Sequence, residues 1–378
     1  MAGGLQFTLI AEDGAARAGR LTTPHGRVDT PAFMPVGTQA AVKAMAPQEL
    51  WDIGYRLVLS NAYHLALRPG PGLIASLGGI GPFMGWDGAV LTDSGGFQAM
   101  SLAAIRRIDE QGIAFRSHLD GRAMLLTPES SIRIQEELGV DIMMALDECL
   151  GYPADAARTR ASLELTTRWA QRSLRARGEQ GPALFGIVQG GFFPALRRQS
   201  AREITAMPFD GYAVGGLSVG EPKELMLEMA AIGVEQLPKA QPRYLMGVGT
   251  PADLMAAIAM GYDMFDCVLP TRNARNGCAF TSAGRLTIKN QRFATDARPL
   301  DENCGCRTCR SYSRAYLRHL FRAGEILAAR ALTEHNLYFY ASLMRRAQAA
   351  IASGTYAQLA RALCASPMAC IEEMEETN

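Results

Sequence analysis

The sequence predicts an α/β fold in which eight parallel strands alternate with helices around a barrel. Eight short apolar runs are separated by stretches whose apolar residues recur with helical spacing. Strands that are apolar along their whole length are typical of a parallel sheet covered by helices. Eight such units favour a closed TIM barrel, (β/α)8, over an open sheet. The runs are residues 31–36, 56–61, 89–94, 141–148, 183–191, 211–216, 243–249 and 264–270.

The stretches between these runs carry recognisable helix boundaries. A Thr-Pro pair can cap and start a helix, and a following glycine can end it. Two stretches have this pattern, from Thr127 to Gly139 and from Thr250 to Gly261. Helical spacing predicts three further helices, at about 155–177, 194–206 and 222–236.

One barrel accounts for most of the chain, so residues 1–378 are predicted to form a single TIM-barrel domain. Two segments fall outside the regular alternation. Residues 100–127 are predicted to be a hairpin insert. Residues 272–345 follow the eighth strand and contain three closely spaced cysteines, so they are predicted to be a metal-binding subdomain.

The chain is expected to be a cytoplasmic protein without a membrane span. It has no apolar run of about 18 residues or more, the length that a membrane-spanning helix needs. Its first residues include Glu12 and Asp13 and lack the positive start of a signal peptide. Eight cysteines among 378 residues do not make a disulfide scaffold.

Charge is unevenly distributed, although the net charge is only +1. Between Arg272 and Arg322 there are eleven Lys or Arg residues and three Asp or Glu residues, a local excess of +8. The rest of the chain therefore carries about −7. A basic segment of this kind suits a polyanionic partner, but charge alone fits a solvated basic surface equally well.

Several predicted strands end in polar residues, among them Asn61 and three carboxylates, Asp93, Asp147 and Asp266. Catalytic groups of such barrels sit at the C-terminal ends of the strands, so the carboxylates are expected to converge on one mouth. Two carboxylates beside an electrophilic carbon can exchange a glycosidic bond, one as nucleophile and the other in proton transfer. The alternative is that each aspartate only caps the following helix or pairs with an arginine.

Glycine pairs follow two of the predicted strands, at 190–191 and 215–216. Because they lack side chains, a flat group can lie against the backbone, whose N–H and C=O groups can bind its edge. Each pair could equally be an ordinary tight turn. No P-loop, GxGxxG or HExxH motif occurs, so no nucleotide cofactor is implied.

Three thiols within six residues, Cys304, Cys306 and Cys309, predict a metal site. Zinc prefers four ligands in a structural site, and His319 and His335 are the nearby candidates for the fourth. A site closed by four protein ligands would be structural, because no position is left for a substrate. The alternative is three free cysteines.

Six longer motifs carry a resemblance to a known family: TDSGGFQ (92–98), LDEC (146–149), GIVQGG (186–191), AVGGLSVGE (213–221), YLMGVGTP (244–251) and DCVLPTRNARNG (266–277). From about residue 5 to about residue 370, the chain is similar to the bacterial queuine tRNA-ribosyltransferases, also called tRNA-guanine transglycosylases. Cysteines and a histidine at this family's metal spacing imply His335 as the fourth ligand and one structural Zn²⁺ per subunit.

The resemblance implies a pentosyltransferase of queuosine biosynthesis. Such an enzyme exchanges the wobble guanine of tRNAs with GUN anticodons, those for aspartate, asparagine, histidine and tyrosine, for 7-aminomethyl-7-deazaguanine (preQ1). The implied reaction is a retaining double displacement through a covalent RNA–aspartate intermediate. The implied partners are the anticodon loop of tRNA, the 7-deazaguanine base and a second copy of the chain in a homodimer.

The resemblance also implies roles for the residues of the mouth. Asp266 looks like the nucleophile on the ribose, and Asp93 looks like the general acid/base and contacts the substrate. Asp147 would accept hydrogen bonds from the guanine edge, helped by Gln189 and the Gly216 N–H. This allocation suits guanine, whose ring N–H and exocyclic amine are donors.

Further residues are implied to shape the pocket for the base. Phe97 and Met246 would sandwich it, and the Leu217 carbonyl would meet the aminomethyl group. Cys149 and Val219 match the family members that use the aminomethyl base rather than the larger queuine.

Arg272 and Arg275 are expected to hold RNA phosphates or neighbouring bases, although they could instead pair with acidic residues at the barrel rim. The full set that the resemblance implies for tRNA binding is Arg272, Asn273, Ala274, Arg275, Gly247, Val248, Gly249, Thr250 and Pro251.

Two alternative functions fit parts of the sequence. A non-catalytic tRNA-binding partner subunit would be expected to lack the working carboxylates, yet Asp93 and Asp266 are both present. A retaining glycoside hydrolase on the same barrel would lack a metal-clamped basic insert. It would also show aromatic platforms for sugars, whereas this chain has only three Trp.

Overall fold

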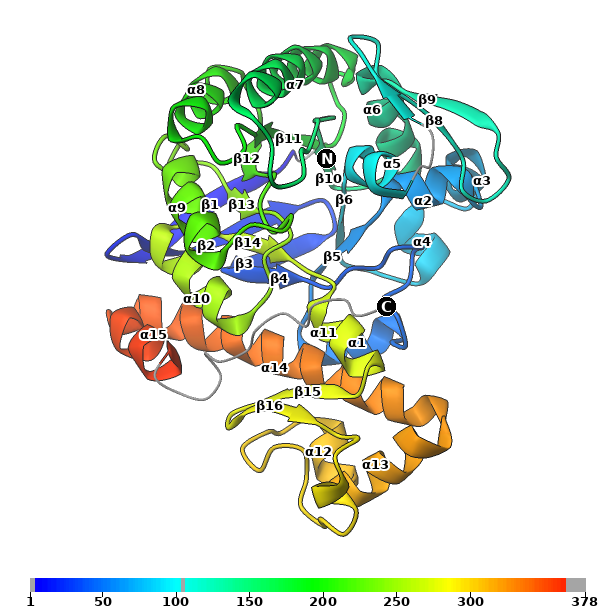
Figure 1. Cartoon of the computed structure of the whole chain (residues 1–378), viewed down its shortest axis with the longest axis vertical. Coiled ribbons are helices and arrows are strands. Elements are labelled where there is room, and N and C mark those ends of the chain that lie inside the picture. Colours follow the sequence, from blue (N-terminus) through cyan, green and yellow to red (C-terminus); the bar gives the residue numbers. More distant parts are fainter. Residues whose placement is uncertain (1–3, 103–105, 365–378) are drawn as a thin grey trace.

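The computed structural model describes residues 4–102 and 106–364, and the predicted barrel forms its centre (Figure 1). Eight parallel strands lie in the order β4-β14-β13-β12-β11-β10-β6-β5. Each strand lies inside one of the eight predicted runs. The strands are β4 (Ala32–Met34), β5 (Leu57–Ser60), β6 (Ala89–Thr92), β10 (Ile142–Met144), β11 (Ala183–Val188), β12 (Gly211–Val214), β13 (Arg243–Leu245) and β14 (Met264–Asp266).

A backbone bridge between the first two strands closes the barrel. β4 and β5 stand at the two ends of the strand order, and Val36 pairs with Leu59 in parallel register. The Gly37 N–H donates to the Leu59 carbonyl (2.6 Å), and the Leu59 N–H donates to the Pro35 carbonyl (3.0 Å). The predicted α/β TIM barrel is therefore confirmed.

Two apolar layers explain why the strands are apolar along their whole length. Met34, Leu91 and Phe185 belong to the buried cluster that fills the barrel. Val90 and Leu184, their neighbours along the strands, belong to the cluster between strands and helices. Successive residues of a strand point to opposite faces, and here both faces are buried.

The outer helices begin and end largely where the sequence indicates. α6 (Pro128–Leu138) is capped by the Thr127 side chain, which accepts a hydrogen bond from the Ser130 N–H, and it ends at Gly139. The other predicted helices are α7 (Ala156–Ala176), α8 (Pro194–Thr205), α9 (Lys223–Val234) and α10 (Pro251–Met260). Between β4 and β6 the helices are short: α1 (Pro47–Ile53), α2 (Ala62–Leu67), α3 (Pro71–Ser76) and α4 (Ile80–Met84).

An antiparallel sheet that the sequence analysis did not anticipate precedes the barrel. Its strands are β1 (Gln6–Asp13), β2 (Ala16–Thr23) and β3 (Gly26–Thr30). Leu21 and Val28 of this sheet join the cluster that fills the barrel. Arg17 forms a buried ion pair with Asp263 (3.0 Å), which immediately precedes β14. The sheet therefore covers the N-terminal end of the barrel, opposite the ends of the strands that carry the carboxylates.

The insert at 100–127 contains more than the expected hairpin. α5 (Gly96–Leu102) is followed by a three-stranded antiparallel sheet of β7 (Arg106–Ile108), β8 (Ile113–Arg116) and β9 (Ala123–Leu126). Asp109 and Gly112 exchange two backbone hydrogen bonds of 3.1 Å in the first turn. The Ser117 N–H donates to the Arg122 carbonyl (3.0 Å) in the second. Because there are two turns, two hairpins share β8.

After β14, the chain forms α11 (Leu269–Arg275) and then a small subdomain with its own core, drawn below the barrel in Figure 1. Ile288, Phe293 and Leu317 are buried in this core. Its elements are β15 (Cys278–Thr281), β16 (Gly284–Thr287), the 3-10 helix η1 (Gln291–Phe293), α12 (Arg307–Ser311) and α13 (Arg314–Ala323).

A single long helix, α14 (Ile326–Ala352), joins this subdomain to the barrel. Leu332 belongs to the subdomain core, whereas Tyr340 and Ala347 belong to the barrel core. The predicted boundary at residue 345 therefore falls within a continuous helix, which α15 (Tyr356–Cys364) follows. Among the described residues, no helix is both long and apolar enough to cross a membrane.

Candidate active site and metal centre

The three strand-end aspartates come together at the C-terminal mouth of the barrel. Asp93 directly follows β6, Asp147 lies just beyond β10, and Asp266 ends β14. The charge of Asp266 raises the pKa of Asp93, and the charge of Asp93 raises the pKa of Asp147. Groups that influence one another in this way share one electrostatic environment, so the three carboxylates lie near one another.

Asp93 is buried and held by donors from the end of the preceding strand. The Asn61 side-chain amide donates to Oδ2, and the Ala62 N–H donates to Oδ1 (2.9 Å). Burial is the main cause that raises the pKa of Asp93 to about 6. A carboxyl group with a pKa near neutrality can both give and take a proton, as a general acid/base must.

Asp266 is held through one of its two oxygens. The Tyr244 hydroxyl (2.6 Å) and the Gly247 N–H (2.9 Å) both donate to Oδ1. Burial raises the pKa of Asp266, while the hydrogen bonds from Tyr244 and Gly247 oppose this shift and favour the ionised form. Because both donors engage Oδ1, Oδ2 is the oxygen best placed to attack an electrophilic carbon.

Asp147 forms an acceptor pair with Gln189, whose Nε2 donates to Asp147 Oδ2 (2.7 Å). Burial is the main cause that raises the pKa of Asp147 to about 6, and the Asp93 and Glu148 charges add to it. Because this pKa is still below neutral pH, the carboxylate is mostly ionised at pH 7 and can accept hydrogen bonds from a donor-rich edge.

The backbone at Gly216 lies directly against this pair. Gly216 has φ +67°, and a Cβ there would stand 2.3 Å from Gln189 Oε1, so a larger residue would be strained and would displace the Gln189 side chain. The Gly216 N–H interacts with the Cys149 thiol, whose pKa burial raises to about 12. Met246 is close as well: its sulfur lies 3.5 Å from where a Cβ of Gly215 would be.

Two other predicted base contacts sit in different surroundings. Phe97 lies on α5 and is 51% exposed, so its ring offers a face on which a base can stack. The Leu217 side chain is buried. The Glu221 carboxylate accepts hydrogen bonds from the N–H groups of Ser218 (2.6 Å) and Val219 (2.8 Å), which holds the loop that carries Leu217 and Val219.

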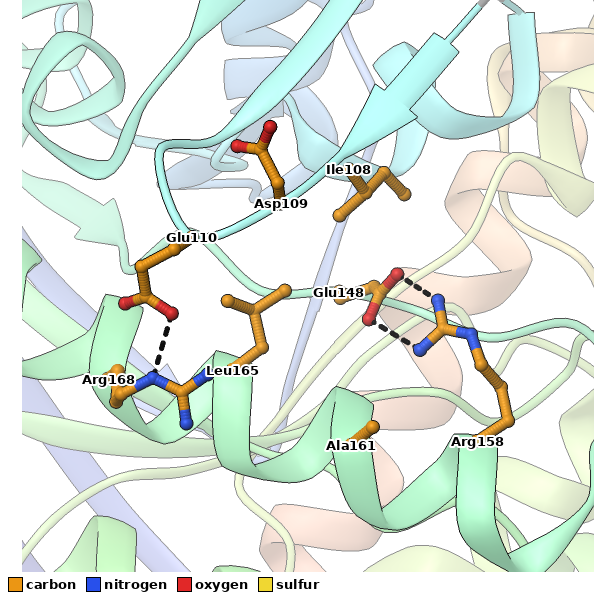
Figure 2. A pocket seen from close by; sticks show the side chains of 8 residues that line it. All are labelled: Ile108, Asp109, Glu110, Glu148, Arg158, Ala161, Leu165 and Arg168. Atoms are coloured by element: carbon orange, nitrogen blue, oxygen red, sulfur yellow. Dashed lines mark hydrogen bonds and ion pairs between the residues drawn. The ribbon is translucent and has the colours of Figure 1, made fainter.

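Glu148, the acidic residue next to Asp147, lines a cavity of about 370 Å³ between α7 and the insert (Figure 2). Arg158 donates to both carboxylate oxygens of Glu148, and Arg168 Nε donates to Glu110 (2.9 Å). Glu148 is therefore turned toward α7 and ion-paired with Arg158 there, which leaves Asp147 as the acceptor that faces Gln189.

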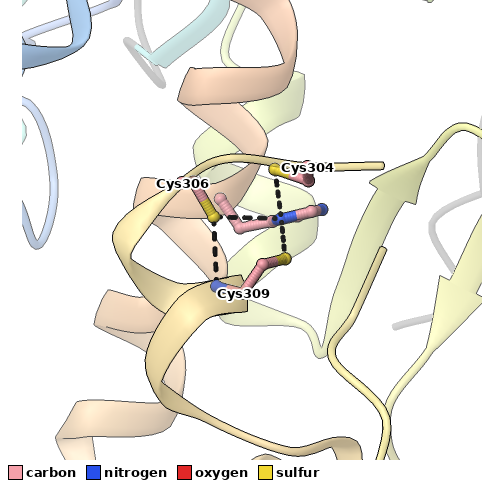
Figure 3. A group of neighbouring side chains, drawn as sticks. Cys304, Cys306 and Cys309 are labelled. Atoms are coloured by element: carbon pink, nitrogen blue, oxygen red, sulfur yellow. Dashed lines mark hydrogen bonds between the residues drawn. The ribbon is translucent and has the colours of Figure 1, made fainter. Parts of the chain in front are cut away.

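The predicted metal ligands form one compact cluster, shown in Figure 3. Cys304, Cys306 and Cys309 offer sulfurs at 3.6, 3.6 and 3.3 Å from His335 Nδ1. A tetrahedral zinc ion, with bonds of about 2.3 Å to sulfur and about 2.0 Å to nitrogen, holds such atoms about 3.5 Å apart. The donor set and its spacing therefore fit a structural zinc ion, as predicted, with His335 as the fourth ligand.

A second contact orients the histidine for this role. His335 Nε2 lies 2.8 Å from the Phe280 carbonyl, to which it donates. This hydrogen bond leaves Nδ1 as the nitrogen with a free lone pair, and Nδ1 is the atom that faces the sulfurs. His335 stands on α14 and Phe280 on β15, so metal binding would fasten the subdomain to the helix it shares with the barrel.

Comparisons with known proteins agree with this geometry. The sequence model described as queuine tRNA-ribosyltransferase matches residues 12–368. The chain belongs to this family. A queuine tRNA-ribosyltransferase of Solidesulfovibrio magneticus is 56% identical over 353 residues, 93% of this chain and 95% of the relative. That of Moorella thermoacetica is 54% identical over 356 residues, 94% and 95% of the two chains.

The residues that the family resemblance predicts for tRNA binding differ in accessibility. Arg272 and Arg275 lie on α11, directly after the strand that ends in Asp266, and Arg272 is exposed. Gly247 is exposed too, and Asn273 is partly buried. The others are buried, so they could reach RNA only through backbone atoms: Ala274, Val248, Gly249, Thr250 and Pro251. All of these contacts stay predictions.

The sequence analysis did not predict the roles of three supporting residues of this site. Tyr244 lies in an apolar strand and looks like an ordinary core residue, so no sequence signal marks it. Arg197 lies on α8 and looks like a surface arginine, yet it is fully buried. Asn61 did carry a signal, because it is polar and stands at the end of a strand.

Proposed function

We propose that this chain is a tRNA-guanine transglycosylase that exchanges the wobble guanine of GUN-anticodon tRNAs for preQ1. One observation carries the proposal. The buried Asp93 and the partly buried Asp266, whose charge raises the pKa of Asp93, lie beside an Asp147–Gln189 pair that matches the donor edge of guanine. Glycosyl exchange and recognition of a guanine-like base are thus available at one mouth. Membership of the queuine tRNA-ribosyltransferase family supports the same reaction.

The proposed reaction proceeds in two displacements. Asp266 Oδ2 attacks the ribose anomeric carbon while the bond to guanine breaks, and Asp93 gives a proton to the departing base. The incoming preQ1 then gives its ring proton to the Asp93 carboxylate and attacks the same carbon, which releases Asp266. Two inversions give net retention, and atoms and protons balance without a cofactor.

The zinc ion is proposed to act on structure alone, since its four ligands leave no position for a substrate. It would fix the subdomain that contains most of the basic segment between Arg272 and Arg322. Arg272 and Arg275 are proposed to bind RNA phosphates or bases next to the reacting nucleotide.

The proposal is tested by incorporation of radiolabelled guanine into an anticodon stem–loop RNA with a G-U-N loop. We expect label in this RNA and none in a stem–loop whose wobble guanine is replaced by adenine. Absence of label with a folded, zinc-loaded protein that still binds the RNA would contradict the proposal. A non-catalytic tRNA-binding subunit would then explain the chain better.

Binding of guanine is expected to weaken about tenfold as the pH falls from 7 to 5. Asp147, with a pKa of about 6, is mostly ionised at the higher pH and mostly protonated at the lower one. Only the ionised form offers acceptors on both oxygens to the guanine donors. The dissociation constant of guanine, measured at each pH by isothermal titration calorimetry, checks this without requiring base exchange by the variants.

The matched controls for this pH effect are Asp147→Asn and Asp93→Asn. We expect the dependence to disappear in the first variant, which cannot ionise at this position, and to persist in the second. A guanine affinity that is constant over this range in the unmodified enzyme would show that Asp147 does not titrate there.

We further propose that the enzyme is a cytoplasmic homodimer. The proposed tRNA substrate supports the location, which cell fractionation checks. Ile326 and Leu327, at the start of α14, are 81% and 38% exposed, an apolar surface that a second copy could cover. Light scattering that gives twice the chain mass of 40.8 kDa would support the dimer, and the mass of a single chain would contradict it.

A further inference from the structure

Arg197 is a fully buried arginine without a carboxylate partner in the described part of the chain. It lies in the first turn of α8, where a positive charge is unfavourable to the helix dipole. Burial lowers its pKa to about 10, so the guanidinium is still charged at neutral pH. Placing an unpaired cation here costs stability, which indicates that the position serves a purpose other than packing.

All hydrogen bonds of this guanidinium end on backbone carbonyls behind the base site. Nε (3.2 Å) and Nη2 (2.7 Å) donate to the Gly191 carbonyl, and Nη1 donates to the carbonyls of Gly215 (2.9 Å) and Val188 (3.4 Å). Arg197 therefore joins the loop after β11, which follows Gln189, to the loop after β12, which carries Gly216.

The fit of the helix against the first loop is tight. A Cβ at Gly190 would lie 2.6 Å from the Arg197 backbone nitrogen, and Gly190 has φ +122°. Glycine at this position lets the start of α8 approach the loop closely enough for the guanidinium to reach the carbonyls of both loops.

The hydrogen bond from Arg197 to the Gly215 carbonyl affects the Gly216 N–H, the donor that is expected to bind the base. The Gly215 carbonyl and the Gly216 N–H belong to one planar trans peptide, so they point in opposite directions. Arg197 holds the carbonyl from behind, and the N–H points toward Cys149, beside Asp147. A hydrogen bond accepted at the carbonyl also polarises the peptide and strengthens the N–H as a donor.

We propose that Arg197 is a positioning residue for base recognition: it aims and polarises the Gly215–Gly216 peptide so that the Gly216 N–H binds the 6-carbonyl of the purine. This inference rests on the proposed function. Electron density moves onto the departing base as its glycosidic bond breaks, and the N–H can bind that oxygen more strongly at this point. Arg197 thus acts on the substrate through the Gly215–Gly216 peptide and does not contact it.

The test compares guanine with 6-thioguanine, which keeps the ring N–H and exocyclic amine but replaces the 6-carbonyl by a weaker acceptor. Both serve as unlabelled inhibitors of labelled-guanine incorporation by the full-length enzyme. In Arg197→Met, we expect the inhibition constant of guanine to rise about tenfold, the size of one hydrogen bond to a well-placed donor. That of 6-thioguanine should rise less than about threefold.

Arg197→Lys provides the conservative comparison. Lysine keeps the charge but lacks the planar fork that reaches both loops, so partial recovery of the preference for guanine is expected. Arg198→Met is the matched control, because Arg198 is the next residue on α8 and its side chain pairs with Glu235 at the surface. It should leave both inhibition constants unchanged. If Arg197→Met does not fold, as judged by circular dichroism, Arg197→Lys carries the comparison.

Equal losses for the two bases in a folded Arg197 variant would overturn the inference, because a merely structural defect would not distinguish the two bases. An unchanged preference for guanine would overturn it as well. Both results presuppose incorporation by the unmodified enzyme. Failure of that incorporation would instead contradict the proposed function, so the two failures can be told apart.

Discussion

Replacing Asp266 by asparagine is expected to lower the rate of base exchange by about 10⁴-fold or more. The amide cannot act as an anionic nucleophile, so no covalent RNA–protein species can form. The substitution keeps the shape of the side chain, and its oxygen can still accept hydrogen bonds from Tyr244 and Gly247, so the fold should persist. Labelled-guanine incorporation measures the rate, and denaturing gels detect the covalent species.

The matched control is Asp87→Asn, the same change at an exposed residue before β6, at the N-terminal end of the barrel. It should retain full activity. A folded Asp266→Asn variant that keeps a tenth of the original rate would contradict the assignment of Asp266 as nucleophile. A covalent RNA adduct on that variant would point to Asp93 instead.

Replacing His335 by alanine is expected to reduce bound zinc from about one ion per chain to near zero. Three thiolates then lack their fourth partner, and the contact with the Phe280 carbonyl is lost as well. Because binding energy at a structural zinc site is largely folding energy, the subdomain between β15 and α13 should unfold locally. Atomic emission measures the zinc, and limited proteolysis followed by mass spectrometry locates the cleavage.

His319→Ala is the matched control, since His319 was the other candidate ligand and its side chain is exposed on α13. It should keep its zinc and its resistance to protease. Cys309→Ser should behave like His335→Ala without opening a cavity in α14. Full zinc content in both ligand variants would show that the four residues are not the metal site.

Much of the barrel could be predicted because its signals are local. A run such as 183–188 is apolar throughout, and the cap at Thr127 and the stop at Gly139 lie within a few residues of the helix they bound. The sheet β1–β3 was missed because its edge strand alternates between exposed and half-buried residues. Such a pattern fits a strand, but the strand's partners and its place beneath the barrel depend on distant residues such as Asp263.

The sequence by itself determined the α/β barrel, the three strand-end carboxylates and the three thiolate ligands, because strand periodicity and close ligand spacing are properties of short segments. Between His319 and His335, spacing alone left the fourth ligand open, and family resemblance implied the second. Only the tertiary structure decided that Tyr244 holds Asp266 and that Arg197 lies behind the Gly215–Gly216 peptide. Those contacts join different strands and helices, and the register that creates them comes from closing the whole barrel.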